Sequence, residues 1–356
     1  MAIRRIAAAE ALSRAAAFDA VIDARSPAEF ALDRLPGSIN WPVLDDEQRA
    51  RVGTEYVQVS PFTARVVGAA LVARNIAAHV ERELPGKARS WKPLVYCWRG
   101  GQRSGALATV LDAIGFPVHL LDGGYQAFRT HVRQELETLP TVFDWHVLCG
   151  RTGSAKSRLL KALAEQGAQV VDLEALACHR GSVLGPLPGQ PQPSQKAFDT
   201  ALWHALRGLD PARPVFVEGE SRTVGRLRVP ERLIEALRAA PVIQVQMPLR
   251  ARVDFLLDDY VHFVDDIEAF CDKLHALRDL RGAAVIECWQ QMARTGALPA
   301  VVQELLEQHY DPIYERSMAR NFTHYAQARP LALADASPAS LKQAAATLLP
   351  MPNLTR

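Results

Sequence analysis

The sequence predicts an α/β protein of two domains, each built around a mainly parallel β-sheet. The chain has 356 residues, which at about 100–200 residues per domain suggests two domains. Short apolar runs typical of buried strands alternate with amphipathic runs typical of helices, the pattern of parallel sheets connected by helices. This pattern breaks at Pro140, and a new apolar strand follows. We therefore expect domains at residues 1–139 and 140–356, the second a doubly wound parallel sheet with a helical part over about residues 250–325.

The first domain is expected to contain these strands and helices in alternation. Strand-like runs cover residues 20–23, 92–96 and 118–121, and helix-like runs cover residues 63–83, 104–114 and 125–139. At the N-terminus, Arg4 and Arg5 precede an apolar stretch that Glu10 and Arg14 interrupt. This pattern predicts an amphipathic first helix rather than a signal peptide.

The second domain repeats the alternation and then becomes helical. Strands are expected at residues 145–149, 169–172, 215–218, 242–247 and 330–334, and a closing helix at residues 341–349. Leu, Ile and Val at three- and four-residue spacing predict helices from about residue 250 to 320. Residues 185–193 are rich in Pro and Gly, and because proline fixes φ we expect an ordered excursion or a flap facing the substrate.

Composition excludes several classes of protein. Hydrophobic residues make up 49% of the chain and charged residues 22%, which excludes global disorder. No run approaches the ~18–20 apolar residues of a membrane helix, so we expect no membrane association and a cytoplasmic location. The net charge of +2 gives no general argument for nucleic-acid binding. The five cysteines are widely spaced and include no C-x-x-C pair, which fits a reducing compartment and no zinc site.

One cysteine directly follows an expected strand and begins a glycine-bearing loop. The segment reads Cys97-Trp98-Arg99-Gly100-Gly101-Gln102-Arg103-Ser104. Ligands of parallel sheets bind beyond the carboxyl ends of the strands, so we expect the thiol to face a cleft. The two glycines allow the amides to form an anion-binding nest, and the following helix and two arginines add positive charge. These features favour the thiolate and predict a nucleophile that holds a persulfide or perselenide.

A second glycine loop follows the first strand of the second domain. The segment Gly150-Arg151-Thr152-Gly153-Ser154-Ala155-Lys156-Ser157 lies between an expected strand and an expected helix, as in a P-loop. Its amides would surround a phosphate group, Lys156 would reach the outer oxygens, and Ser157 would face a magnesium ion. Ala155 stands where the usual pattern has its last glycine, which is tolerable if that residue is already helical. The loop predicts an anion site, with ATP as only one of its candidate ligands.

Further polar residues of the second domain are candidates for the same cleft. They lie at expected strand ends or in loops: Asp172, His179, Arg180, Glu218, Glu220 and Arg222. The carboxylates would organise magnesium or water, or else serve as helix caps and surface charges. Cys149, Cys271 and Cys288 are expected in the core, and the neighbours Cys178 and His179 are not expected to form a metal site.

Three motifs of the first domain resemble the rhodanese family of sulfurtransferases. They are the loop that begins at Cys97, the run from Asp23-Ala24-Arg25 through Glu29-Phe30 to Gly37-Ser38-Ile39-Asn40, and Asp122-Gly123-Gly124-Tyr125-Gln126-Ala127-Phe128. Pro36 stands where many rhodaneses have a glycine–histidine turn, a departure that concerns loop conformation more than chemistry. The resemblance covers about residues 1–135 and implies a rhodanese-like first domain.

Nearly the whole chain resembles the tRNA 2-selenouridine synthase family. The matching segments of the second domain are Gly150-Arg151-Thr152-Gly153, Asp172-Leu173-Glu174, His179-Arg180-Gly181-Ser182 and Glu218-Gly219-Glu220-Ser221-Arg222. The resemblance implies that wobble 2-thiouridine in tRNA is converted with geranyl diphosphate to S-geranyl-2-thiouridine, and then with selenophosphate to 2-selenouridine. It implies a selenium intermediate on Cys97, and tRNA and small phosphate donors as partners. We expect no tightly bound cofactor, with magnesium as a candidate ion. We expect a monomer.

Two other functions fit the same residues. A rhodanese-type sulfurtransferase fused to an ATP-dependent kinase or NTPase would act on a small molecule or carrier protein and turn over magnesium-ATP without RNA. A non-catalytic anion-sensing module with a degenerate P-loop is suggested by Ala155 and would have a Cys97 thiol of ordinary reactivity. The sequence leaves open whether geranyl diphosphate, ATP or a tRNA phosphate occupies the P-loop.

Overall fold

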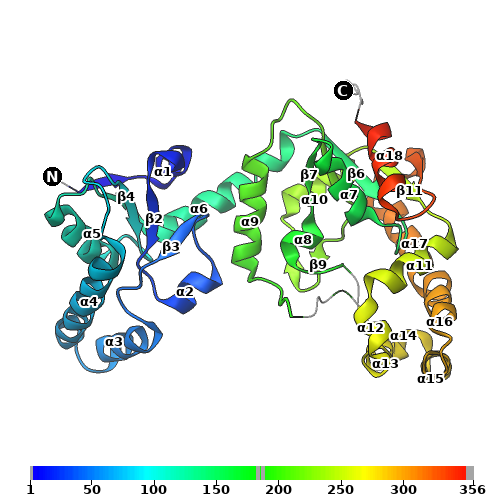
Figure 1. Ribbon diagram of the computed structural model, residues 1–356, viewed down its shortest axis with the longest axis horizontal. Coiled ribbons are helices and arrows are strands. Elements are labelled where there is room, and N and C mark those ends of the chain that lie inside the picture. The colour runs from blue at the N-terminus through cyan, green and yellow to red at the C-terminus, as the bar shows by residue number, and fades with distance from the viewer. Residues whose placement is uncertain (1–2, 182–184, 186–188, 350–356) are drawn as a thin grey trace. The chain divides into compact units, whose positions relative to one another are not determined.

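The computed structural model describes residues 3–181, 185 and 189–349, which form two compact units (Figure 1). Unit 1 contains the described residues up to Glu135 together with the segment Pro193–His204. Unit 2 contains the rest of the described chain. Each unit has a five-stranded parallel sheet, so the predicted α/β fold class is confirmed. Nothing in the sequence pattern predicted that residues 193–204 pack with unit 1.

The sheet of unit 1 is fully parallel and lies between helices. Its strands, in spatial order, are β1 (Arg4–Ile6), β5 (His119–Leu121), β4 (Pro93–Tyr96), β2 (Ala20–Asp23) and β3 (Ser38–Asn40). Its helices are η1 (Ala15–Ala17), α1 (Ala8–Ser13), α2 (Pro27–Leu32), α3 (Asp46–Gln58), α4 (Pro61–Glu83), α5 (Gln102–Ile114), α6 (Gly124–Leu136) and most of α9 (Gln195–Arg207). Strand β4 is buried along its whole length, so Cys97, which follows it, lies at the carboxyl end of a buried strand.

The N-terminal segment differs from the predicted amphipathic helix. Arg4–Ile6 forms strand β1, which pairs with β5, and helix α1 begins only at Ala8. Ile6 is buried, and the pairing completes the edge of the sheet. A strand of three residues is too short for its alternation to be recognised, and β3 was missed for the same reason.

Unit 2 combines a second parallel sheet with a helical part. Its strands, in spatial order, are β12 (Arg329–Ala332), β11 (Val242–Gln246), β6 (Trp145–Cys149), β8 (Val215–Glu218) and β7 (Gln169–Val171), and β9 (Thr223–Val224) and β10 (Leu227–Arg228) form a separate hairpin. Helices near the sheet are η2 (Leu139–Thr141), α7 (Lys156–Glu165), α8 (Leu173–Ala177), α10 (Glu231–Ala239), η4 (Tyr325–Gln327) and α18 (Pro338–Leu348). The helical part comprises α11 (Leu249–Asp259), α12 (Val261–Asp265), α13 (Ile267–His275), α14 (Arg278–Arg281), α15 (Ala283–Arg294), α16 (Leu298–Glu304), the π-helical η3 (Leu305–Tyr310) and α17 (Asp311–Asn321).

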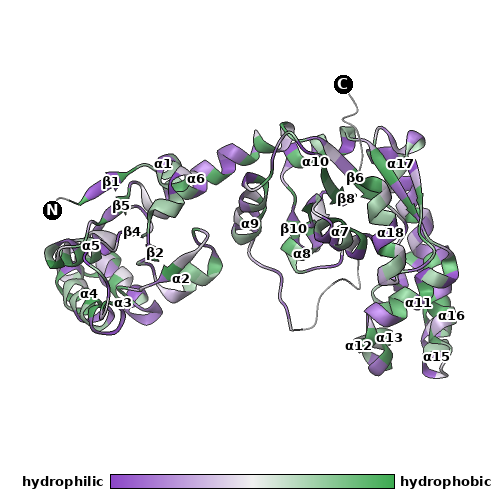
Figure 2. Cartoon of the chain, turned by 45° about the horizontal axis from the view of Figure 1, so that its top comes forward, coloured by the Kyte–Doolittle hydropathy of each residue, from purple (hydrophilic) through white to green (hydrophobic). Residues whose placement is uncertain are grey.

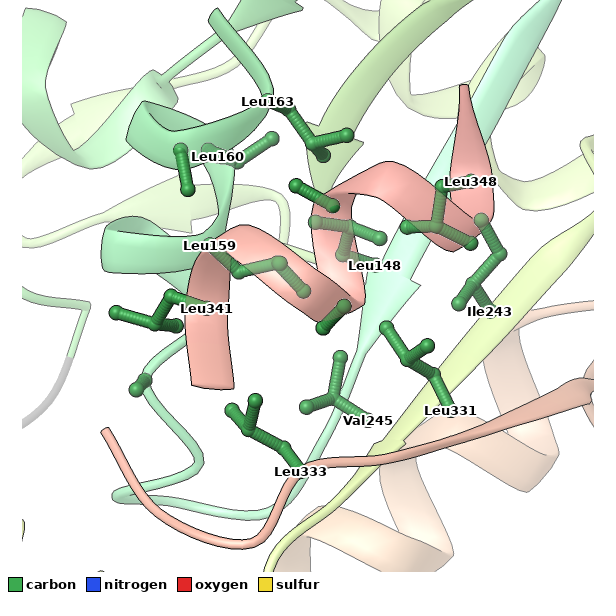
Figure 3. Close-up of a cluster of buried hydrophobic side chains, with 14 of the residues drawn as sticks. Leu148, Leu159, Leu160, Leu163, Ile243, Val245, Leu331, Leu333, Leu341 and Leu348 are labelled. Atoms are coloured by element: carbon green, nitrogen blue, oxygen red, sulfur yellow. The ribbon is translucent and has the colours of Figure 1, made fainter. Parts of the chain in front are cut away.

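The central strand of unit 2 carries the second glycine loop at its carboxyl end. All residues of β6 are buried, and β6 lies between β8 and β11. From β6 the chain first builds one side of the sheet and later the other, so the loop after β6 lies at the switch point where doubly wound sheets bind ligands. Helices α7 and α18 pack on this strand, and Figure 3 shows Leu159 and Leu163 of α7 with Leu341 and Leu348 of α18 around Leu148.

Other predictions have mixed outcomes. Cys149 and Cys271 are buried as predicted, but Cys288 is exposed, because Ile286 and Trp289 belong to the buried face of α15. Residues 182–184 and 186–188 of the predicted Pro- and Gly-rich loop lie outside the described residues. Within the described part of the chain, every helix is too short or too polar to cross a membrane.

Candidate active site

The thiol of Cys97 lies beneath the loop that connects β4 to α5. Cys97 directly follows β4, and the Ser104 hydroxyl donates a hydrogen bond to its Sγ at 3.0 Å. The residue is only 3% exposed and packs with Val95 and Leu107 in the core of unit 1. The structure corrects the expectation that this thiol faces an open cleft. A reagent reaches the sulfur only if the covering loop or side chains move.

The covering loop is held by the start of α6 and presents its amides as a cradle. Gly100 and Gly124 both have positive φ, and a Cβ on Gly124 would lie 2.5 Å from the amide nitrogen of Gly100. The Tyr125 amide donates to the Cys97 carbonyl at 2.8 Å. Within the described residues, the amides of residues 99–102 have no hydrogen-bond acceptor. Amides arranged in this way at a helix N-terminus suit an anion.

The two arginines of the loop have different surroundings. Arg99 is exposed, and its Nε donates to the Gln126 side chain at 2.9 Å. Arg103 is paired with Glu29 at 2.6 Å, and both side chains are largely buried. Burial alone would raise the pKa of Glu29, but the hydrogen bond and charge of Arg103 outweigh it and lower the pKa. Arg103 is therefore paired with a carboxylate. Arg99 forms no ion pair with any residue that the structure describes, so of the two arginines expected to add positive charge it is the one that does.

An aromatic pair and a lysine from a distant segment lie beside the Cys97 loop. Trp98 stacks on Tyr125 with ring centroids 5.3 Å apart, and Lys196 Nζ lies 5.7 Å from the centre of the Trp98 ring. Lys196 is on α9, which Arg129 holds by pairing with Asp199 at 2.8 Å. Sequence reasoning missed the contacts of α9 because the partners are far apart in the chain, 70 residues in the case of Arg129 and Asp199.

The second glycine loop has the geometry of a phosphate loop with one unusual residue. Ala155 has a φ of 55°, in the left-handed region, so it is not helical as the sequence analysis required. This conformation costs a residue with a Cβ roughly 1–2 kcal/mol, which explains why glycine is usual there. Lys156 Nζ donates to the Gly150 carbonyl at 2.7 Å, and the Ser157 hydroxyl donates to Glu174 at 3.0 Å. The lysine thus already lies over the loop.

Side chains of the helical part hold this loop in place. The Gly150 amide donates to the Tyr314 hydroxyl at 2.6 Å, and Arg252 Nε donates to the Thr152 carbonyl at 2.8 Å. Arg252 also forms a bidentate pair with Asp311 at 2.6 and 2.8 Å, and its side chain is 2% exposed. None of these partners belongs to a motif, so sequence reasoning could not find them.

The remaining side chains of the loop differ in burial. Arg151 is exposed and pairs with Glu315 of α17. Ser154 is buried, and its hydroxyl has no hydrogen-bond partner within the described residues. A buried hydroxyl without a partner costs free energy, so an anion on this loop would gain a donor there.

We expect Arg252→Met to lower the free energy of unfolding of unit 2 by about 3–5 kcal/mol, because it leaves the buried Asp311 carboxylate without its partner. The matched control is Arg250→Met on the same helix, where the side chain is 87% exposed and its pair with Asp254 contributes less than about 0.5 kcal/mol. Urea unfolding followed by tryptophan fluorescence measures both changes. Equal effects of the two variants would contradict the role assigned to Arg252.

Carboxylates gather around Lys156 in unit 2. Glu218 accepts a hydrogen bond from the Glu174 amide at 2.8 Å, and its other oxygen has no partner within the described residues. Burial raises the pKa of both Glu174 and Glu218. Burial and the nearby charge of Glu174 raise the pKa of Glu220 to about 8, although Lys156 opposes the shift. Glu220 therefore keeps its proton at neutral pH.

The other predicted residues are only partly brought together. Asp172 caps α8 with its side chain, as one reading of the sequence expected, and Arg180 pairs with Asp259 at 2.7 Å. His179 is buried, and burial lowers its pKa. Arg222 is exposed and pairs with Glu231 of α10. Within residues 3–181, 185 and 189–349, no three His, Cys, Asp or Glu side chains are placed to hold a metal ion by themselves.

We expect the free energy of unfolding of unit 2 to fall as pH rises from about 5 to about 8. In this range folded Glu220 keeps a proton that an unfolded glutamate, with a pKa of ~4.3, has released. Glu174 and Glu218 act in the same direction. In Glu220→Gln the free energy of unfolding should fall less steeply with pH, by on the order of 1 kcal/mol per pH unit. Urea unfolding at several pH values in EDTA buffer measures these changes, and Glu165→Gln at an exposed position is the control. If the free energy of unfolding of Glu220→Gln depended on pH as steeply as that of the natural chain, the prediction would be wrong.

Comparison with known proteins places the two sites in one family. The model of a rhodanese-like domain matches residues 7–131, and the model of the tRNA 2-selenouridine synthase AAA domain matches residues 143–282. A protein of Alcanivorax borkumensis named tRNA 2-selenouridine synthase is 33% identical over 334 residues, covering 84% of this chain and 90% of its own. This chain belongs to the tRNA 2-selenouridine synthase family. The resemblance inferred from the motifs is confirmed.

Other members of the tRNA 2-selenouridine synthase family match over a similar length. The relative in Sulfurovum sp. is 32% identical, covering 85% of this chain and 89% of its own. The relative in Bdellovibrio bacteriovorus is 30% identical, covering 84% and 89%. Both are named tRNA 2-selenouridine synthase, so this chain is a member of a family of enzymes. Cys97 lies in the segment matched as rhodanese-like, and Lys156 lies in the segment matched as the AAA domain.

Proposed function

We propose that this enzyme converts 2-thiouridine at the wobble position of tRNA to 2-selenouridine through S-geranyl-2-thiouridine. Geranyl diphosphate and selenophosphate are the donors. The observation that carries the proposal is the presence, in one member of this family, of a cysteine under an amide cradle and a separate phosphate loop with its lysine in place. Each site suits one of two successive substitutions at the same nucleoside.

The first substitution is assigned to unit 2. The sulfur on C2 of the nucleoside attacks C1 of geranyl diphosphate, a C–S bond forms, and the C–O bond to the diphosphate breaks. The leaving diphosphate takes the electron pair, and the loop amides with Lys156 stabilise its charge. The product carries an alkylated sulfur, which leaves C2 as a thiol more readily than the thiocarbonyl sulfur does.

Magnesium suits the phosphate loop only in company with a phosphate ligand. Mg²⁺ is commonly held by one or two protein oxygens together with water and substrate phosphates. Ser157 and Glu174, whose side-chain oxygens lie 3.0 Å apart, are the residues that would hold it. The ion would offset the charge of the diphosphate. The raised pKa of the neighbouring Glu220, about 8, fits an ion that arrives with the substrate.

The second substitution is assigned to Cys97 of unit 1. Attack of the thiolate on selenium of selenophosphate forms an S–Se bond and breaks the Se–P bond, and the electron pair stays on phosphorus, which leaves as phosphite. The perselenide then attacks C2, and the C–S bond to the geranylthiol breaks. A thiol reductant finally cleaves the S–Se bond and releases selenouridine. Phosphate in place of phosphite would show that Cys97 handles selenide rather than perselenide.

Nucleoside mass spectrometry of tRNA tests the proposed function. Thiolated tRNA incubated with enzyme, geranyl diphosphate, selenophosphate and a thiol should show S-geranyl-2-thiouridine first and 2-selenouridine later. Without geranyl diphosphate neither product should accumulate, and without selenophosphate the reaction should stop at the geranylated nucleoside. Selenation without geranyl diphosphate would overturn the proposed order. Rapid ATP hydrolysis without RNA, and no modified nucleoside, would favour the NTPase alternative.

A further inference from the structure

We propose that an apolar pocket beside the phosphate loop binds the hydrocarbon tail of a prenyl diphosphate whose diphosphate group occupies that loop. The inference rests on the proposed use of geranyl diphosphate and adds to it a second subsite in unit 2. The loop alone recognises only the phosphate groups. The pocket would therefore distinguish geranyl diphosphate from inorganic diphosphate and from nucleotides.

The pocket is formed almost entirely by apolar side chains of the helical part. Leu256 of α11, Leu298 and Val302 of α16, and Leu305 of η3 line it, and helices α11 and α16 pack side by side. Figure 2 shows hydrophobic stretches along both helices. The enclosed volume of the pocket is about 60 Å³, and it is about 540 Å³ when the space at its open side is included. Val264 also lines it and is 40% exposed.

The pocket is continuous with the phosphate loop. Thr152 belongs to the loop and lines the pocket. The next residue, Gly153, has a φ of +80°, and a Cβ there would lie 3.0 Å from the side chain of Leu256. Leu256 thus lines the pocket and contacts the loop, so a ligand held by the loop amides has an apolar surface next to it. A molecule with a phosphate head and a hydrocarbon tail matches this arrangement.

The chemistry of the lining favours a hydrocarbon over a nucleobase. A base needs several donors and acceptors at its edges, whereas the polar groups here are limited to Thr152 and the hydroxyl ends of Tyr260 and Tyr310. A hydrocarbon tail needs none, and each carbon that it buries contributes about 0.8 kcal/mol, or about fourfold in affinity. The pocket therefore predicts an affinity that rises with tail length until the space is filled.

Binding measurements with a series of diphosphates test the proposal. Titration calorimetry of the full chain, with Mg²⁺ and without tRNA or selenophosphate, compares inorganic, dimethylallyl and geranyl diphosphate. We expect geranyl diphosphate to bind at least about 100-fold more tightly than inorganic diphosphate. Val302→Phe, which fills the pocket, should remove at least about tenfold of this preference and leave binding of inorganic diphosphate unchanged. Gln303→Phe places the same bulk on the exposed neighbouring position and should change neither.

A second variant covers the case in which the filled pocket does not fold. Leu257→Asn keeps the size of a lining side chain and makes it polar, so it too should weaken geranyl diphosphate selectively. Equal binding of geranyl and inorganic diphosphate by the natural chain would overturn the pocket proposal and leave the phosphate loop in place. Failure to bind any diphosphate would overturn both this inference and the assignment of the loop to geranyl diphosphate.

Discussion

Cys97→Ala should abolish selenation of tRNA while the same protein continues to geranylate it. The sulfur is the only atom of unit 1 assigned to bond formation, so its loss should reduce selenation on the order of 10³-fold or more. Geranylation is assigned to the phosphate loop of unit 2 and should remain within about twofold. The expected product is S-geranyl-2-thiouridine that accumulates in the presence of selenophosphate, measured by nucleoside mass spectrometry over time.

The other cysteines supply controls for this prediction. Cys288→Ala removes an exposed thiol of unit 2 and should leave both reactions unchanged. Cys149 is buried, and burial raises its pKa to about 12, so it should resist alkylation at pH 8 in the folded protein. Ser104→Ala removes the hydrogen bond to Cys97 and should slow selenation less than loss of the sulfur does. Full selenation by Cys97→Ala would contradict the role of this residue.

The sequence predicted the architecture well where patterns are local. Strand β6 is a continuous apolar run followed by a glycine loop and a helix, and such a run has few alternatives in an α/β chain. Strands of two or three residues carry too little pattern, which is why β1, β3 and the β9–β10 hairpin were missed. The helices between residues 250 and 320 were predicted as a class but not individually.

The motifs singled out Cys97 and Lys156 as candidates, and the structure surrounds both with contacts that the sequence did not predict. Each lies at a loop whose residues are neighbours in sequence and in space. Burial of Cys97 depends on the turn at Gly124, and the charge of Arg103 depends on Glu29, 74 residues away. The left-handed φ of Ala155 depends on the path that the loop takes around its own amides. None of these can be read from local periodicity.

Lys156→Ala should weaken binding of geranyl diphosphate about 100-fold and reduce geranylation at least as much. Lys156 Nζ lies 2.7 Å from the Gly150 carbonyl, over the loop whose amides would hold the diphosphate. A charge-assisted hydrogen bond to a phosphate contributes roughly 1.5–3 kcal/mol, which corresponds to about 10- to 150-fold in affinity. The lysine also lowers the pKa of Glu174 and Glu220, so its removal favours their protonated forms, and the lost charge of Lys156 itself is the main effect on anion binding.

The matched control is Lys161→Ala, an exposed lysine on the same helix, α7, which should change binding by less than about twofold. Calorimetry with geranyl diphosphate gives the affinity, and nucleoside mass spectrometry gives the rate of geranylation. Selenation of tRNA that is already geranylated should proceed normally in Lys156→Ala, because that step is assigned to Cys97. Cys97→Ala shows the opposite pattern, so the two variants together separate the two substitutions. If Lys156→Ala lost selenation of geranylated tRNA as well, the phosphate loop would serve both steps, and the assignment of one substitution to each unit would be wrong.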